Sequence, residues 1–180
     1  DPTISLAQEL IQRASVTPND HGCQEILISR LSKIGFECEK LNFADVSNLW
    51  AKHGTSSPCL VFVGHTDVVP PGPLDQWQHQ PFSATIENNM LYGRGAADMK
   101  GSVAAMVVAC ENFIKEHPQH KGSIAWVITS DEEGPAHDGT KRVVEELQKQ
   151  QIKIDWCIVG EPGSQVTLAD TLKLGARGSL

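Results

Sequence analysis

Residues 59–70 read CLVFVGHTDVVP, an apolar strand that runs directly into a histidine and an aspartate. Two further apolar strands are expected at 123–129 and 155–159, and acidic residues follow each of them. Helical patterns separate the three strands. Strands that are apolar along their whole length are typical of a sheet covered by helices on both faces. This stretch and its two counterparts therefore predict an α/β fold.

Helices and weaker strands are expected to fill the rest of the chain. Apolar residues at helical spacing predict helices at about 4–14, 24–34, 98–117 and 139–150. Shorter runs predict strands at 37–43 and 48–52 and a hairpin around Glu87-Asn88-Asn89. A Pro-rich loop is expected from Val69 to Pro81.

Composition limits the partners of the chain. The 180 residues suffice for one domain with a core, and the net charge of −7 argues against a nucleic-acid-binding surface. No apolar run approaches the ~20 residues that span a bilayer, so no membrane partner is expected. Five scattered cysteines without a C-x-x-C pair favour reduced thiols in a cytoplasmic protein (Cys23, Cys38, Cys59, Cys110, Cys157).

Side chains able to bind a metal follow each apolar strand. The first strand leads to His65 and Asp67, the second to Asp131-Glu132-Glu133, and the third to Glu161. In an open α/β sheet, ligands bind beyond the carboxyl ends of the strands. If the three strands run parallel, these side chains meet at one edge, and Asp98 is a further candidate at the start of the long helix. An imidazole with several carboxylates suits zinc, or cobalt or manganese.

Each of these residues also has an ordinary structural explanation. A single histidine after a strand is more often structural, and Asp98 at a helix start is a natural N-cap. Asp131-Glu132-Glu133 could be a solvated acidic loop, and Glu161 a turn residue. Their joint occurrence after every core strand favours a metal site.

Two other motif interpretations fail. Residues 93–98 (GRGAAD) resemble a dinucleotide-binding loop but have Asp98 in place of its third glycine. The chain also has no G-x-S-x-G elbow, which argues against a serine hydrolase.

Four segments together resemble the metal-binding motifs of the M20 metallopeptidase family. They are 64–70 (GHTDVVP), 91–101 (LYGRGAADMKG), 129–133 (TSDEE) and 160–162 (GEP). The resemblance implies a zinc-aminopeptidase-like three-layer sandwich, with a largely parallel, mixed central sheet flanked by helices. It also implies that residues 1–180 are a single catalytic, metal-binding domain that stops before the family's lid and dimerisation domain and its C-terminal catalytic segment.

The resemblance implies metal-binding roles for four residues. His65, Asp98 and Glu161 would hold one zinc. Asp98 would bridge to a second zinc, which Glu133 also binds. The family's second zinc takes a further histidine from far downstream, so this site is expected to lack a ligand and the chain alone to be weak or inactive. Neither His79 nor His137 is expected to replace that histidine.

Two further residues receive catalytic roles from the same resemblance. Glu132 would be the general base that takes the proton from the attacking water and passes it to the leaving amine. Asp67 would hydrogen-bond His65, which fixes the imidazole tautomer and raises its basicity.

Other stretches resemble the family members that remove succinate from an N-succinylated diamino acid in lysine and cell-wall precursor synthesis. They are 15–24 (SVTPNDHGCQ), 48–55 (NLWAKHGT), 138–140 (DGT) and Trp77 before Pro81-Phe82. The implied partner is a small-molecule N-succinylated diamino acid, and the implied whole enzyme is a homodimer through the absent domain. An acetylornithine deacetylase, an aminoacylase or a metal-binding module without catalysis remain alternatives. Glu132 and Asp67 argue against the last, because metal storage would not need them.

Overall fold

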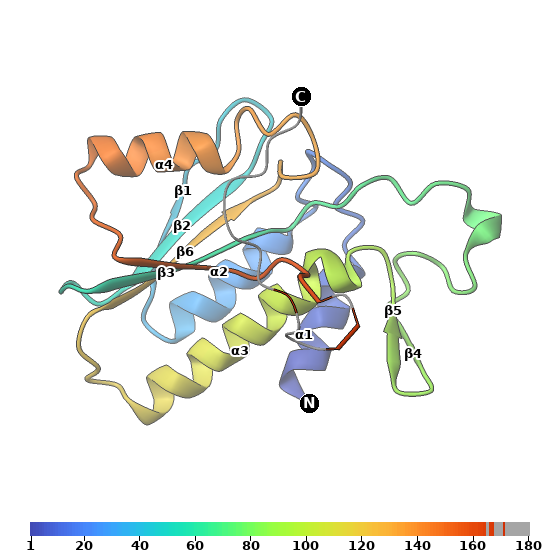
Figure 1. Cartoon of the computed structure of the whole chain (residues 1–180), viewed down its shortest axis with the longest axis horizontal. Helices are drawn as coiled ribbons and strands as arrows, with labels where there is room; N and C mark the ends of the chain where they lie inside the picture. The colour runs from blue at the N-terminus through green and yellow to red at the C-terminus, as the bar shows by residue number, and fades with distance from the viewer. Residues whose placement is uncertain (165, 168–170, 172–180) are drawn as a thin grey trace.

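A mixed five-stranded sheet forms the centre of the computed structural model, which describes residues 1–164, 166–167 and 171 (Figure 1). The strands, in their order across the sheet, are β1 (Glu37–Lys40), β2 (Asn48–His53), β6 (Ser123–Thr129), β3 (Cys59–His65) and β7 (Trp156–Val159). β3 pairs in parallel with β6 and β7, whereas β2 pairs antiparallel with β1 and β6. The α/β fold and the parallel alignment of the three apolar strands are confirmed.

Helices cover both faces of the sheet (Figure 1). On one face pack α1 (Pro2–Ile11), α2 (Cys23–Lys33) and α3 (Gly101–Glu116), and on the other α4 (Thr140–Lys149). Successive residues of each strand point to opposite faces of the sheet and so pack into two hydrophobic cores. Leu49 and Trp126 belong to the core under α1, α2 and α3, while Trp50 and Val127 belong to the core under α4. None of the helices in the described part of the chain is long and apolar enough to cross a bilayer.

The predicted start of the long helix at Asp98 is wrong, because α3 begins at Gly101. Residues 96–100 form a separate turn in which Asp98 (φ −122°, ψ 96°) and Met99 (φ −132°, ψ 27°) leave helical geometry. The residue preceding α3, Lys100, makes no side-chain capping hydrogen bond. Asp98 therefore does not cap this helix, and its carboxylate is free for another contact.

The predicted hairpin is confirmed as β4 (Thr85–Glu87) and β5 (Met90–Tyr92). Its turn residues Asn88 and Asn89 both have positive φ angles, 51° and 61°. Asparagine tolerates this conformation, which the tight turns between antiparallel strands require. A short helical turn, η1 (Leu74–Gln76), lies in the Pro-rich loop before the hairpin.

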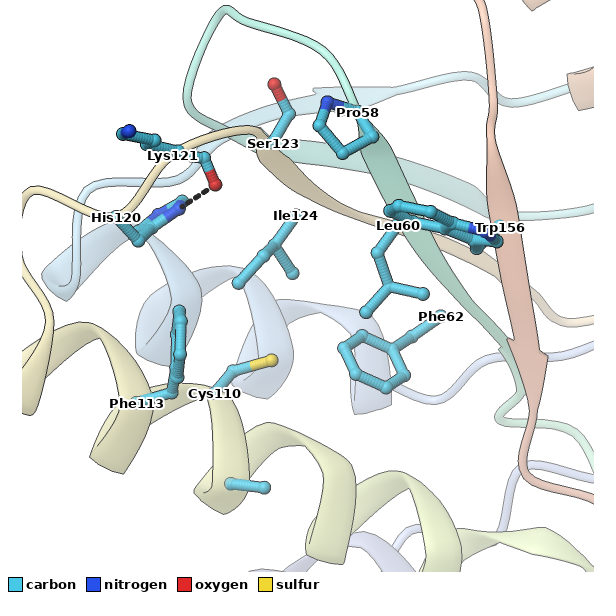
Figure 2. A pocket seen from close by; sticks show the side chains of 11 residues that line it. Pro58, Leu60, Phe62, Cys110, Phe113, His120, Lys121, Ser123, Ile124 and Trp156 are labelled. Atoms are coloured by element: carbon cyan, nitrogen blue, oxygen red, sulfur yellow. Dashed lines mark hydrogen bonds between the residues drawn. The ribbon is translucent and has the colours of Figure 1, made fainter.

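The expectation that every apolar strand is covered on both faces is wrong for β7. All four of its residues are exposed, among them Trp156 (59%) and Val159 (55%), because β3 is its single neighbour among the strands that the structure describes. An apolar groove of about 480 Å³ lies beside it, between α3 and the sheet, where Leu60, Phe113 and Trp156 line its walls (Figure 2). This groove adjoins the amino ends of β3 and β6, away from the edge that the sequence predicts for the metal site.

Candidate metal centre

Polar side chains gather where the carboxyl ends of β3 and β6 lie side by side. His65, the last residue of β3, is paired with Thr129, the last residue of β6, and its side chain is buried. Two overlapping groups of possible metal ligands form around it: His65 with Glu132 and Glu161, and His65 with Asp98 and Glu133. Within each group, one ligand atom from each residue lies within 4.8 Å of the others.

The Nε2 atom of His65 faces the acidic side chains. It lies 3.1 Å from Asp98 Oδ1, 3.4 Å from Glu161 Oε1 and 3.9 Å from Glu132 Oε2. On the other side of the ring, Nδ1 lies 2.8 Å from the backbone oxygen of Asp67 and can donate a hydrogen bond to it. This contact leaves Nε2 as the nitrogen available to a metal.

The carboxylate of Asp67 contacts both His65 and the acidic loop, and the sequence did not indicate the contact with the loop. Toward His65, its Oδ1 lies 3.5 Å from Nδ1, farther than the backbone oxygen of Asp67. The carboxylate accepts hydrogen bonds from the backbone N–H of Glu132 (3.2 Å) and Glu133 (3.1 Å). The strand order could have suggested this contact, since β3 and β6 are neighbours and residues just beyond their ends are adjacent. Asp67 thus fixes both the histidine and the acidic loop.

The pKa values of the two buried groups of the site, His65 and Asp67, agree with this geometry. Burial lowers the pKa of His65. This effect is outweighed by the hydrogen bond with Asp67 and by the negative charges of Asp67 and Glu161, which together raise the pKa to about 9. Burial raises the pKa of Asp67, yet its hydrogen bonds with His65 and with the two N–H groups hold it below its usual value. Without a metal, a protonated His65 therefore pairs with the surrounding carboxylates.

Burial and, to a smaller extent, repulsion among the acids raise the pKa values of two further groups. Burial, the charge of Asp98 and a hydrogen bond with Asp98 raise the pKa of Glu161 to about 7, although His65 opposes them. Burial and the charge of Asp98 also raise the pKa of Glu133. A divalent cation would relieve this repulsion, and one imidazole with several carboxylate oxygens is a donor set that suits zinc. The residues present therefore fit a metal ion.

The acidic cluster is accessible to a substrate. The side chains of Asp98 and Glu132 are 50% and 51% exposed, in contrast to the buried His65. A cavity of about 380 Å³ adjoins the cluster and is lined by Val69, residues 93–98 and Glu133. An exposed carboxylate beside a metal centre can exchange protons with a bound reactant.

Gly95 allows the turn that carries Asp98 to lie against the end of β3. Its φ of +78° is in the left-handed region, and a Cβ atom there would come within 2.4 Å of Val68 Cγ1. The Gly95 carbonyl oxygen accepts a hydrogen bond of 2.9 Å from the backbone N–H of Lys100, which closes the turn. A residue with a side chain would be strained and crowded at this position.

The other two candidate histidines lie outside both ligand groups. His79 packs its ring against Tyr92 (4.6 Å between centroids) and lies 3.3 Å from Glu87 Oε2, in the hairpin region. His137 is exposed in the loop before α4. Within the described part of the chain, the two ligand groups share His65 as their only imidazole.

Comparisons with known proteins agree with the motifs. The sequence profile of Peptidase family M20/M25/M40 matches residues 61–173, more than half of the chain. A succinyl-diaminopimelate desuccinylase from Coxiella burnetii (strain RSA 493 / Nine Mile phase I) is 57% identical over 99% of this chain and 48% of its own length. The enzyme of the same name from Hahella chejuensis (strain KCTC 2396) is 58% identical over 99% of this chain and 47% of its own. The chain thus spans about half the length of these curated relatives.

Solved structures share the fold. Human carnosine dipeptidase 1 superposes with a TM-score of 0.81 at 20% identity, over 90% of this chain and 38% of the dipeptidase. The M20 family metallo-carboxypeptidase Sso-CP2 from Sulfolobus solfataricus gives a TM-score of 0.76 at 22% identity, over 91% of this chain and 38% of its own. The expected zinc-aminopeptidase-like sandwich is confirmed by these two similarities.

Proposed function

Because this chain belongs to peptidase family M20/M25/M40, we propose that it is the metal-binding part of an enzyme that hydrolyses N-succinyl-LL-2,6-diaminopimelate to succinate and LL-2,6-diaminopimelate. The observation that carries the proposal is the 57% identity, over 99% of the chain, to enzymes named succinyl-diaminopimelate desuccinylase. Since the chain spans about half of these relatives, the activity is assigned to the whole protein of which residues 1–180 are a single truncated domain.

Zinc is the proposed metal, with cobalt or manganese as substitutes. His65, Asp98 and Glu161 would hold one ion, and the 3.1 Å and 3.4 Å distances from His65 Nε2 to the two acids support this set. Asp98 would bridge to a second ion held by Glu133; these two acids occur together, with His65, in the second ligand group. Such a metal pair polarises an amide carbonyl and lowers the pKa of a water molecule.

Glu132 is proposed as the general base. Its half-exposed carboxylate lies 3.9 Å from His65 Nε2, beside the proposed ligands. The carboxylate would take a proton from the attacking water and deliver it to the amide nitrogen, so that the free amine leaves and succinate remains. Asp67 would keep Glu132 in place through the hydrogen bond to its backbone N–H.

The rest of the whole protein would complete the site. It would supply a second histidine to the Glu133 ion and the contacts to the substrate carboxylates, and its lid domain would form a homodimer. All five cysteines are free thiols; Cys157 is exposed and Cys38 is half-buried. Free thiols support a reducing, cytoplasmic location.

A substrate panel on the full-length protein tests the proposed reaction. N-succinyl-diaminopimelate, N-acetylornithine and an N-acyl amino acid are each assayed with zinc by the release of free amine. The proposal expects the succinylated substrate to be preferred by at least about 100-fold in kcat/KM, because a buried polar site rejects analogues that leave its groups unpaired. A clear preference for N-acetylornithine or the N-acyl amino acid would assign the protein to another branch of the family, and no hydrolysis by a zinc-loaded protein would favour a metal-binding module.

A further inference from the structure

Lys100 is a fully buried lysine that has no place in the proposed chemistry. Its Nζ donates hydrogen bonds to the backbone oxygens of Leu10 (2.9 Å) and Arg13 (2.8 Å). Among the residues that the structure describes, no carboxylate lies within 4.0 Å of this ammonium group. A lysine is almost never fully buried without a partner, so these two carbonyl groups must account for its position.

The two carbonyl groups belong to the end of α1, far from Lys100 in sequence. Leu10 lies in the last turn of α1, and Arg13 follows it. A helix presents partial negative charge and unpaired carbonyl oxygens at its C-terminal end, so an ammonium group is stabilised there. The side chain of Lys100 thus joins the end of α1 to the turn that carries Asp98.

Neither carbonyl depends on Lys100 alone for a hydrogen bond. The Leu10 oxygen also accepts from the backbone N–H of Arg13, and the Arg13 oxygen accepts from the N–H of Ser15. An apolar side chain of similar length could therefore fill the same space without leaving these oxygens wholly unpaired. What such a side chain would lose is the link between α1 and the Asp98 turn.

The segment after α1 also holds the other ligand-bearing part of the site. Ser15 Oγ donates to the backbone oxygen of Thr66 at 2.6 Å, and the N–H of Val68 donates to the Ser15 oxygen at 2.9 Å. Thr66 lies between His65 and Asp67. Residues 10–15 therefore contact both the end of β3 and, through Lys100, the Asp98 turn, and so set the two ligand-bearing segments relative to each other.

We infer that Lys100 is a positioning residue of the metal centre: by binding the end of α1, it fixes the Ala96–Lys100 turn and holds the Asp98 carboxylate toward His65. The inference rests on the proposed role of Asp98 as a ligand. Groups that orient metal ligands without touching the ion commonly contribute about 10- to 100-fold to metal affinity.

The first test measures the metal-free protein, so that it does not depend on the proposed reaction. Amide hydrogen exchange is compared for the 180-residue chain, Lys100→Met, and Lys33→Met, which removes an exposed lysine of α2 as a control. The backbone N–H of residue 100 donates to the Gly95 oxygen. In Lys100→Met, exchange at this N–H should become about tenfold faster relative to exchange at the amides of β6. Exchange as in the unsubstituted chain, in a folded Lys100→Met protein, would overturn the inference.

The second test measures Co²⁺ affinity by visible absorption, a readout that a general loss of stability in a folded variant does not move. Lys100→Met should bind Co²⁺ at least about tenfold more weakly, whereas Lys100→Arg, which keeps N–H donors, should recover part of the affinity and Lys33→Met should bind normally. Equal affinities would overturn the positioning role. If the unsubstituted chain bound no Co²⁺, the proposed metal centre would be contradicted, while the exchange experiment would still decide whether Lys100 holds the turn.

A third measurement needs no variant and decides the matter if Lys100→Met does not fold. Coupling between two sites is reciprocal, so Co²⁺ bound by Asp98 should slow exchange at the amides of Arg13 and Ser15 in the unsubstituted chain. Unchanged exchange at these amides, with Co²⁺ bound, would contradict the inference.

Discussion

The carboxylate of Asp67 accepts a hydrogen bond of 3.1 Å from the backbone N–H of Glu133, which ties the end of β3 to the acidic loop after β6. The same carboxylate accepts from the N–H of Glu132, while the backbone oxygen of Asp67 orients His65. One residue thus sets the relative positions of a proposed imidazole ligand, a proposed carboxylate ligand and the proposed base. Its own exposure is nil, so it cannot itself reach a substrate.

Replacement of Asp67 should therefore weaken metal binding. Asp67→Ala leaves the two loop N–H groups without their acceptor and removes the charge beside His65, and a loss of about 10- to 100-fold in zinc affinity is expected. Competition with a chromophoric chelator measures it. Asp75→Ala, which removes an exposed carboxylate of η1, is the control and should bind zinc normally. Unchanged affinity in Asp67→Ala would show that the loop is held by other contacts.

Glu132→Gln separates catalysis from metal binding. In the full-length protein, the amide cannot accept a proton, so kcat should fall by at least about 100-fold while the zinc content stays normal. Glu145→Gln, on the exposed face of α4, should be fully active. Near-normal turnover in Glu132→Gln would rule out this residue as the base.

The pKa of His65 predicts how pH affects the metal-free chain. A folded pKa of about 9, above the ordinary 6.5, means that the protonated ring stabilises the fold fully below about pH 6.5. This contribution is lost as the pH rises through about 9, and it amounts to about 3 kcal/mol. The raised pKa of Glu161, about 7, acts in the same direction. Urea unfolding without metal should therefore show a falling free energy of unfolding between about pH 6 and about pH 9; a rise over this interval would contradict the assigned pairs.

Metal binding should have the opposite pH dependence. The ion must displace a proton from His65, so binding should release about one proton or more at neutral pH. Calorimetry in two buffers of different ionisation enthalpy measures this release. Zinc should also raise the unfolding temperature more at about pH 8 than at about pH 6. Binding without proton release would mean that His65 is not a ligand.

Gly95 and Gly72 offer a matched pair of substitutions. Both have φ angles near +75°, but a Cβ at Gly95 would come within 2.4 Å of Val68 Cγ1, whereas nothing lies within 4 Å of one at Gly72. Gly72→Ala should cost about 1 kcal/mol of unfolding free energy from backbone strain alone. Gly95→Ala should cost more, by at least about 1 kcal/mol, and should also weaken metal binding. Equal costs would mean that the turn moves away from Val68 freely.

Much of the architecture could be predicted because it depends on local pattern. The apolar runs at 59–63 and 123–129 become β3 and β6, and their parallel pairing brings together the acids that follow them. The four-segment resemblance identified the same cluster. By contrast, the predicted start of α3 is wrong, because the sequence pattern at Asp98 is that of a helix start while Gly95, in the left-handed region, begins a separate turn over residues 96–100.

The remaining features depend on contacts between distant residues. The hydrogen bonds from Lys100 to Leu10 and Arg13 join positions 90 and 87 residues apart, and those from Glu132 and Glu133 to Asp67 span 65 and 66. No spacing rule predicts such pairs. The exposure of β7 was likewise missed, since an apolar strand has the same sequence pattern whether it lies at an edge or in the centre of a sheet.

The number of zinc ions bound per chain tests the central claim most directly. The 180-residue chain and His65→Ala are dialysed against dilute zinc at neutral pH, and bound metal is measured by elemental analysis on samples whose folding is checked by circular dichroism. At least one zinc per chain is predicted for the unsubstituted protein, and none for His65→Ala, because both ligand groups share this imidazole. A folded chain that binds no zinc, or a His65→Ala variant that binds as much as the unsubstituted chain, would contradict the metal centre described above.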